Sequence, residues 1–348
     1  LNKNGFDCVA TVEIKQERLN FQKLNNYCRY ENGYISGDIS KISTKEILYA
    51  QFEFYKQIEN IKELDFLIAT PPCQGMSVAN HKKGEEIVRN SLILESIKIV
   101  NKIKPRVFIF ENVTSFLKTL CTDTDNMDKP ISDVIKNHLY DNYNVTSKII
   151  NFKDYGSNSS RPRTLVIGVR KDIKGIAPMD IFPELKPGKT IRKSLRVLKK
   201  LKDFGEFDKN DSYHFFRTYP EKMKSWIANI GQGESAFNNK DPLHRPHRII
   251  DGKIIQNKSK NSDKYKRNYW DSIAPCVHTR NDQLASQNTI HPEENRVFSI
   301  RELMIFLNIP KKYKWSNFSI NKLNSFTETR KINFMKKNEL NIRRCLGE

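Results

Sequence analysis

The stretch Asp65-Phe66-Leu67-Ile68-Ala69-Thr70-Pro71-Pro72-Cys73-Gln74-Gly75 decides the fold of this chain. Residues 64–69 are apolar and end at two prolines, which predicts a short strand buried on both faces of a parallel sheet. Ligands and catalytic groups gather where the carboxyl ends of parallel strands open onto a crevice, so Cys73 is a candidate nucleophile. The alternative is an inert apolar residue, which a cysteine considered by itself usually is.

Strands and helices alternate on both sides of this stretch. Two predicted strands, 7–13 and 34–39, each carry a carboxylate near the end, Glu13 and Asp38, and the predicted strand 107–110 leads into Glu111. Predicted helices cover 16–25, 42–61, 91–103, 131–139, a basic segment 191–201, and 299–307 with a capping box of Ser299 and Glu302. Further strands are predicted over 145–152 and 165–169. This order predicts an α/β protein with a doubly wound, Rossmann-like sheet.

The composition changes after Arg170, where regular patterning gives way to polar, irregular sequence. We expect a catalytic and cofactor domain over 1–172, a smaller loop-rich domain over 173–310, and a return to the first domain over 311–348. The net charge of +20 favours a polyanion as partner. Solvated surface charge is the alternative reading of that excess.

The six cysteines contain no CxxC pair, which argues against a structural zinc site and against a disulfide scaffold. Scattered free cysteines of this kind favour a location in the reducing cytoplasm. No apolar run approaches the roughly 20 residues of a spanning helix, so we expect no membrane partner. The chain begins at Leu1, not Met, and we expect it to be an excerpt of a longer protein. We also expect a monomer without a bound metal.

A thiol, a carboxyl group and guanidinium groups meeting in one crevice suit chemistry on cytosine. C5 of cytosine is a weak nucleophile until a thiolate adds at C6, and an acid at N3 and a guanidinium at O2 would stabilise that adduct. Pro71-Pro72-Cys73-Gln74, Glu111-Asn112-Val113 and Arg161-Pro162-Arg163 resemble, in order and spacing, the central motifs of the C5-cytosine DNA methyltransferases. Residues 296–307 and 342–348 resemble later motifs of that family.

The resemblance implies a role for each matching residue. Cys73 would attack C6, Glu111 would contact N3 and the exocyclic amine, Arg163 would contact the base carbonyl, and Arg161 would support the base or a phosphate. The cofactor would be S-adenosylmethionine, held by Glu13 at the ribose, Asp38 and Ile39 at the adenine, and Pro72 near the methyl donor, with Ile14 also in the cofactor site.

The partner implied is double-stranded DNA, from which the target cytosine must be flipped. The loop 75–89 would close over the base with Ser77 and Lys82 near the strand. Basic residues of the second domain, among them Arg267 and Arg280, are candidate phosphate contacts. The protein would associate with the nucleoid when bound to DNA and would protect DNA in a restriction-modification system.

Two departures from the family pattern leave alternatives open. Ser159 stands where a glutamine is usual, and the glycine-rich first motif is missing; Gly231-Gln232-Gly233 is predicted to be a turn instead. One alternative is a tRNA cytosine-5 methyltransferase, and another is a non-catalytic DNA-binding homologue or subunit. Methyl incorporation into tRNA and duplex DNA separates the first, and the coding sequence upstream of Leu1 tests the second.

Overall fold

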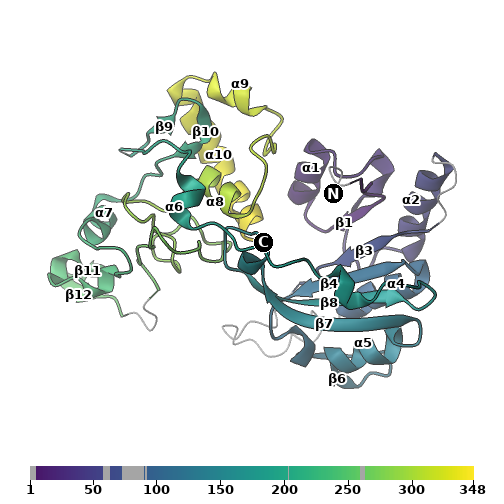
Figure 1. Cartoon of the computed structure of the whole chain (residues 1–348). Coiled ribbons are helices and arrows are strands. Elements are labelled where there is room, and N and C mark those ends of the chain that lie inside the picture. Colours follow the sequence, from purple (N-terminus) through teal and green to yellow (C-terminus); the bar gives the residue numbers. More distant parts are fainter. Residues whose placement is uncertain (1–4, 58–62, 73–89, 91, 203, 259–262) are drawn as a thin grey trace. The chain divides into compact units, whose positions relative to one another are not determined.

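The computed structural model describes residues 5–57, 63–72, 90, 92–202, 204–258 and 263–348 (Figure 1). The chain divides into two compact units: unit 1 comprises Leu1–Asn151 and Pro162–Glu184, and unit 2 comprises Phe152–Arg161 and Leu185–Glu348. Residues 311–348, which the sequence assigns to the catalytic domain, are grouped here with unit 2. The assignment of catalytic and recognition roles to these segments stays a prediction.

Unit 1 contains the predicted helices and strands of an α/β domain, with the first two strands shorter than predicted and with two short strands, over 120–122 and 128–130, that the sequence did not predict. Its helices are α1 (Gln16–Leu24), α2 (Thr44–Lys56), α4 (Leu92–Ile103) and α5 (Ile131–Leu139). Its strands are β1 (Thr11–Glu13), β2 (Tyr34–Ser36), β3 (Phe66–Ala69), β4 (Val107–Asn112), β5 (Leu120–Thr122), β6 (Asp128–Pro130), β7 (Tyr143–Asn151) and β8 (Pro162–Arg170).

The main described sheet has the order β3-β4-β8-β7, with β3 and β4 parallel and β8 antiparallel to both of its neighbours. Alternate residues of β4 point to opposite faces, as the two-residue period of a strand requires. Phe108 and Phe110 pack with the apolar faces of α4 and α5. Val107 and Ile109 pack on the other face against residues 173–182. Both faces of the central strand are therefore covered.

The prediction that the 64–69 strand is buried on both faces is wrong, because the apolar residues of this segment are half-buried at most and Ile68 is exposed. Ile68 is 54% exposed, whereas Leu67 and Ala69 pack against the α4 and α5 side. The reason is that β3 is an edge strand of the described sheet, and the apolar cluster on its second face includes Phe66 but not Ile68.

The strands β1 and β2 form a separate parallel pair, with Glu13 opposite Ser36. Residues of α2 and α4, including Ile47, Ala50 and Ile99, pack with Val12 and Ile35 of these strands. Both strands therefore run in the same direction and end side by side, which brings the residues after β1 next to those after β2.

Unit 2 is built from short elements joined by long connections, as its composition predicts. They are α6 (Ile191–Leu195), β9 (Phe207–Asp208), β10 (Asp211–Phe215), α7 (Glu221–Ala228), β11 (His247–Ile250), β12 (Lys253–Gln256), α8 (Ile300–Phe306), α9 (Ile320–Asn324) and α10 (Glu328–Gly347). The capping box of Ser299 and Glu302 is confirmed at α8. No helix among those the structure describes is both long and apolar enough to cross a bilayer.

The predicted basic helix 191–201 is wrong in length, because α6 ends at Leu195. Arg192, Arg196 and Lys200 would follow one another at four-residue spacing in a longer helix, and such like-charge pairs destabilise it. The turn predicted at 231–233 is confirmed: Glu234 accepts from the Gly231 backbone N–H at 2.7 Å and closes the loop.

Candidate active site

Three segments of unit 1 meet at one edge of the main sheet. Ala69 at the end of β3 lies opposite Phe110 of β4, and Asn112 at the end of β4 lies opposite Thr164 of β8. Because β8 is antiparallel, its first residues lie where β3 and β4 end. This register places residues 70–72, 111–113 and 162–164 beside one another.

Glu111 and Arg163 form an ion pair at this edge, with 2.8 Å between Glu111 Oε1 and Arg163 Nε. Their side chains are 22% and 15% exposed, so both can reach a ligand while remaining partly shielded from water. Arg163 also donates from Nη1 to the Pro162 carbonyl at 2.8 Å. A guanidinium carries five N–H donors in a planar fork, so Arg163 can hold Glu111 and present further donors to a base carbonyl.

Asn112 ties the end of β4 to the segment that precedes Cys73. Asn112 is only 3% exposed, and its side-chain amide donates a hydrogen bond to the Pro71 carbonyl at 2.9 Å. Its Oδ1 accepts from the backbone N–H of Val113 at 2.9 Å, which fixes the orientation of the amide. Cys73, Ser77 and Lys82 lie outside the described residues, so their predicted roles rest on the sequence.

The predicted cofactor residues lie at the ends of β1 and β2. The backbone N–H of Gly37 donates to the Glu13 carbonyl at 3.1 Å and so joins the two strand ends. Glu13 accepts from the Lys15 backbone N–H at 2.9 Å and lies 3.6 Å from Arg18 Nη1. These contacts hold the Glu13 carboxylate at the edge, where its oxygens can accept hydrogen bonds from a pair of hydroxyls.

Asp38 accepts from the Ser40 hydroxyl at 2.7 Å and from the Ser40 backbone N–H at 3.0 Å. These bonds lower the pKa of Asp38 and keep its carboxylate charged. Ile14 is 62% exposed beside Glu13, while Ile39 packs partly into the core. Two carboxylates next to an uncovered apolar side chain fit the polar ribose and flat adenine of S-adenosylmethionine. Pro72 is exposed after β3.

Arg161 belongs to unit 2, although it is only two residues from Arg163. Its Nη2 donates to the Glu348 carbonyl at 3.0 Å, and its Nη1 lies 4.0 Å from the Cys276 sulfur. The guanidinium therefore holds the end of α10 within its own unit. A role for Arg161 in base binding stays a prediction.

Arg267 was expected to contact DNA phosphates, and the structure contradicts this. The residue is 3% exposed, and its guanidinium donates to four backbone carbonyls and one side-chain oxygen at 2.7–3.1 Å: Ile227, Ile230, His291, Glu294 and Asn295. Burial lowers the pKa of Arg267. The sequence could not show this because the acceptors come from distant stretches of the chain.

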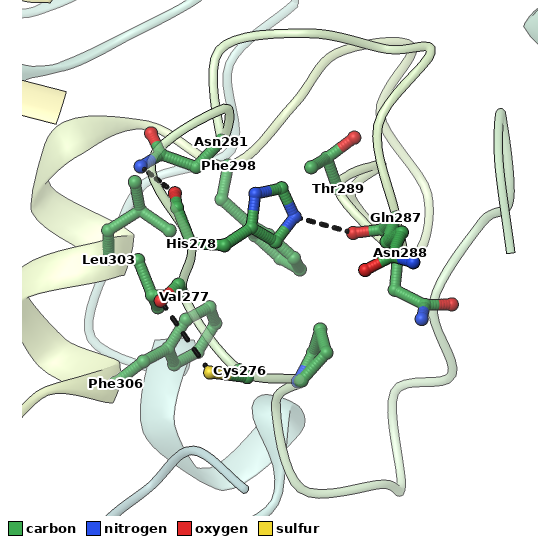
Figure 2. A pocket seen from close by; sticks show the side chains of 11 residues that line it. Cys276, Val277, His278, Asn281, Gln287, Asn288, Thr289, Phe298, Leu303 and Phe306 are labelled. Atoms are coloured by element: carbon green, nitrogen blue, oxygen red, sulfur yellow. Dashed lines mark hydrogen bonds between the residues drawn. The ribbon is translucent and has the colours of Figure 1, made fainter. Parts of the chain in front are cut away.

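Arg280, the other predicted phosphate contact, is exposed and donates to Gln283 Oε1 at 2.8 Å. The neighbouring segment 275–281 lines a small cavity of about 10 Å³, enough for about one water molecule (Figure 2). There His278 Nε2 donates to the Gln287 carbonyl at 3.0 Å, and Asn281 donates to the His278 carbonyl at 2.7 Å. This cavity is too small for a base.

A buried ion cluster orders the start of α8. Arg296 is fully buried and donates to both oxygens of Glu302 at 2.6 and 2.8 Å and to Glu294 at 2.9 Å. His291 lies beside it, and its Nδ1 accepts from the Glu294 backbone N–H at 2.9 Å. Burial, reinforced by Arg296, lowers the pKa of His291 to about 3. The imidazole is therefore neutral at physiological pH.

Sequence reasoning missed the hairpin β11–β12, which it had assigned to irregular structure. The available signal was Asp251-Gly252 between two Ile-Ile pairs, since an Asp-Gly dipeptide flanked by apolar residues is typical of a tight hairpin. In the described part of the chain, no group of three or more His, Cys, Asp or Glu side chains is arranged to hold a metal.

Sequence and structure comparisons match this chain to DNA methyltransferases. The family model described as C-5 cytosine-specific DNA methylase matches residues 1–326. The type II methyltransferase M1.HgaI of Avibacterium volantium is 28% identical over 333 residues, covering 90% of this chain and 85% of the relative. M.AquIA of Picosynechococcus sp. is 29% identical over 212 residues, covering 56% of this chain and 81% of the relative.

Solved structures share the fold at low identity. An E. coli prophage protein described as a DNA modification methyltransferase has a TM-score of 0.60 at 18% identity, covering 99% of this chain and 92% of its own. The S. pombe Dnmt2 methyltransferase has a TM-score of 0.53 at 15% identity, covering 100% and 88%. With the family match extending over most of its length, this chain belongs to the C-5 cytosine-specific DNA methylases and is a DNA cytosine-5 methyltransferase that uses S-adenosylmethionine.

Proposed function

We propose that the chain methylates C5 of a cytosine flipped out of double-stranded DNA, with Cys73 as the nucleophile and the Glu111–Arg163 pair as the base-binding groups. This proposal rests on two contacts at one edge of the main sheet. Glu111 and Arg163 form an ion pair of 2.8 Å, and Asn112 holds the carbonyl of Pro71, two residues before Cys73, at the same edge. A covalent mechanism needs these three segments together, whereas a protein that only binds DNA does not.

In the proposed reaction the Cys73 thiolate forms a bond to C6, and the electron pair of the C5–C6 double bond moves to C5. S-adenosylmethionine supplies the methyl group that C5 accepts. Transfer of the C5 proton to solvent then re-forms the C5–C6 double bond, and the Cys73 sulfur leaves C6 as a thiolate. Glu111 and Arg163 act by stabilising charge on the ring while the sulfur is attached.

The ion pair limits how Glu111 takes part. The carboxylate oxygens of Glu111, one of which is paired with Arg163, can accept a hydrogen bond from the exocyclic amine of cytosine. A hydrogen bond from the Glu111 carboxyl group to N3 requires a proton on one of these oxygens. Arg163 keeps its position through Pro162 and can turn further N–H groups to the base carbonyl.

We propose the cofactor site, the biological role and the oligomeric state on the basis of the same activity. We place the cofactor against Glu13, Ile14, Asp38, Ile39 and Pro72. The type II relatives support a role in protecting DNA within a restriction-modification system, and action on genomic DNA would place the protein on the nucleoid. We expect it to act as a monomer, because one chain supplies every residue named for the reaction.

Covalent trapping tests the mechanism. Duplex DNA carrying 5-fluorocytosine at the target should form a stable adduct, because fluorine cannot leave C5 as the proton does. The adduct should be absent from Cys73→Ala and appear as a mass increase on the peptide containing residue 73 of the wild type. An adduct that persists in Cys73→Ala, or that maps to another residue, would contradict the mechanism.

A further inference from the structure

The hairpin β11–β12 of unit 2 is a regular antiparallel ribbon closed by a tight turn. Arg248 pairs with Ile255, and Ile249 pairs with Ile254. The turn residues Asp251 and Gly252 have φ values of 50° and 72°, the left-handed conformation that a two-residue hairpin turn requires. The ribbon therefore has a fixed register and a defined set of side chains on each face.

Four isoleucines on this ribbon are uncovered. Their exposed fractions are 67% for Ile249, 45% for Ile250, 45% for Ile254 and 42% for Ile255. The ribbon is attached at its base, where the His247 ring packs edge-on against Trp226 of the unit 2 core at 5.4 Å. Four exposed isoleucines on one hairpin indicate a surface that binds another molecule.

The charge on the ribbon identifies that molecule. Strand alternation places Arg248, Ile250, Lys253 and Ile255 on one face, which we call the cationic face. All four side chains are exposed. If two copies of the chain formed a symmetric dimer through this face, Arg248 and Lys253 of one copy would face Arg248 and Lys253 of the other. Repulsion between these like charges makes a second copy a poor partner for the face. Duplex DNA combines phosphates for the cations with apolar thymine methyl groups for the isoleucines.

We infer that the β11–β12 hairpin enters the major groove of the DNA substrate and helps to select the target sequence, with Ile250 and Ile255 contacting thymine methyl groups. A two-stranded ribbon fits the major groove, which is about 12 Å wide. Arg248 is placed to reach a guanine edge or a phosphate from the same face. This inference rests on the proposed function, since it assumes that the chain methylates duplex DNA.

The first experiment defines the target. Bisulfite sequencing of DNA from cells that express the full chain gives the methylated motif of the wild type, of I250N/I255N and of R248A/K253A. The control is L120N/M127N on the β5–β6 hairpin of unit 1, where Leu120 and Met127 are 48% and 62% exposed. Thermal unfolding of each purified variant should occur near the wild-type temperature, because all the substituted side chains are exposed.

The second experiment tests the contact itself. Each thymine of the motif is replaced in turn by deoxyuridine, which removes only the C5 methyl group. For at least one position, kcat/KM of the wild type should fall about tenfold, and I250N/I255N should show no such loss. R248A/K253A should weaken binding and reduce its dependence on salt. The control variant should behave like the wild type.

The outcomes separate this inference from the proposed function. If the wild type makes no 5-methylcytosine in any DNA, the proposed function fails. If the wild type is active but I250N/I255N keeps its motif, its rate and its response to deoxyuridine, the hairpin is not a reader. A motif without A·T pairs, or a wild-type dimer that I250N/I255N converts to monomers with unchanged sequence preference, would also overturn the inference.

Discussion

Replacing Arg267 by methionine should destabilise unit 2 without removing a DNA contact. Methionine keeps an unbranched apolar stem but supplies none of the five hydrogen bonds that the guanidinium makes at 2.7–3.1 Å. In the variant the Glu294 carbonyl keeps its hydrogen bond from the Arg296 backbone N–H at 2.8 Å. The other four oxygens lose the hydrogen bond that Arg267 donated to them. At about 1 kcal/mol each, partly offset by no longer burying a charge, the loss is about 3 kcal/mol.

For a unit of this size, such a loss corresponds to a fall in Tm of about 6–12 °C. The measurement is thermal unfolding followed by circular dichroism, with DNA binding measured from low to moderate salt. The matched control is Arg248→Met, in which an exposed arginine of the same unit is replaced and Tm should stay within about 2 °C.

The opposite pattern would refute this reasoning. If Arg267 contacts a phosphate, Arg267→Met should keep the wild-type Tm, bind DNA more weakly, and lower the slope of log affinity against log salt by about one. A buried structural role predicts a lower Tm and, for the fraction that remains folded, an unchanged slope.

Three further predictions concern the other charged groups. Glu111→Gln should lower single-turnover methylation about 100-fold while duplex affinity changes less than threefold, and a rate within twofold of the wild type would contradict its role beside Arg163. Glu13→Gln should weaken S-adenosylmethionine binding about tenfold by calorimetry with DNA binding intact; equal affinity would remove Glu13 from the cofactor site. His291 has a pKa of about 3 when folded, below its unfolded value, so the unfolded state binds the extra proton as pH falls below about 6.5. Stability should therefore drop by about 2 kcal/mol between pH 6.5 and 5 in urea unfolding, and a His291→Asn variant that keeps the same slope would show that another group is responsible.

Features set by neighbouring residues were predictable from the sequence. The helix 131–139 and the capping box at Ser299 depend on side chains within one turn, and both are confirmed. The prediction that Glu111 and Arg163 share one edge is also confirmed, because β8 runs antiparallel to β4, a direction that the apolar runs alone do not indicate. The resemblance added the chemistry of cytosine, which no local pattern contains.

Features set by distant partners were not predictable. The burial of Arg267 depends on carbonyls from residues 227–230 and 291–294, whereas its sequence neighbours Lys264 and Lys266 suggested a surface position. The exposure of Ile68 depends on which segments cover an edge strand. Arg161 and Arg163 look like one motif in sequence, yet each makes its described contacts within a different unit.

The carbonyl cage around Arg267 sets the limits within which target specificity can be exchanged between relatives. Its donors and acceptors lie at residue 267, at 227–230 and at 291–295, and the hairpin at 247–256 falls inside that interval. A chimaera with a single junction between 230 and 291 would combine an arginine from one parent with carbonyls placed by another. Grafts that carry residues 227–302 as one block, or the hairpin 247–256 alone, keep the cage residues from one parent and should fold. Grafts that move Arg267 without its acceptors should be recovered as insoluble protein.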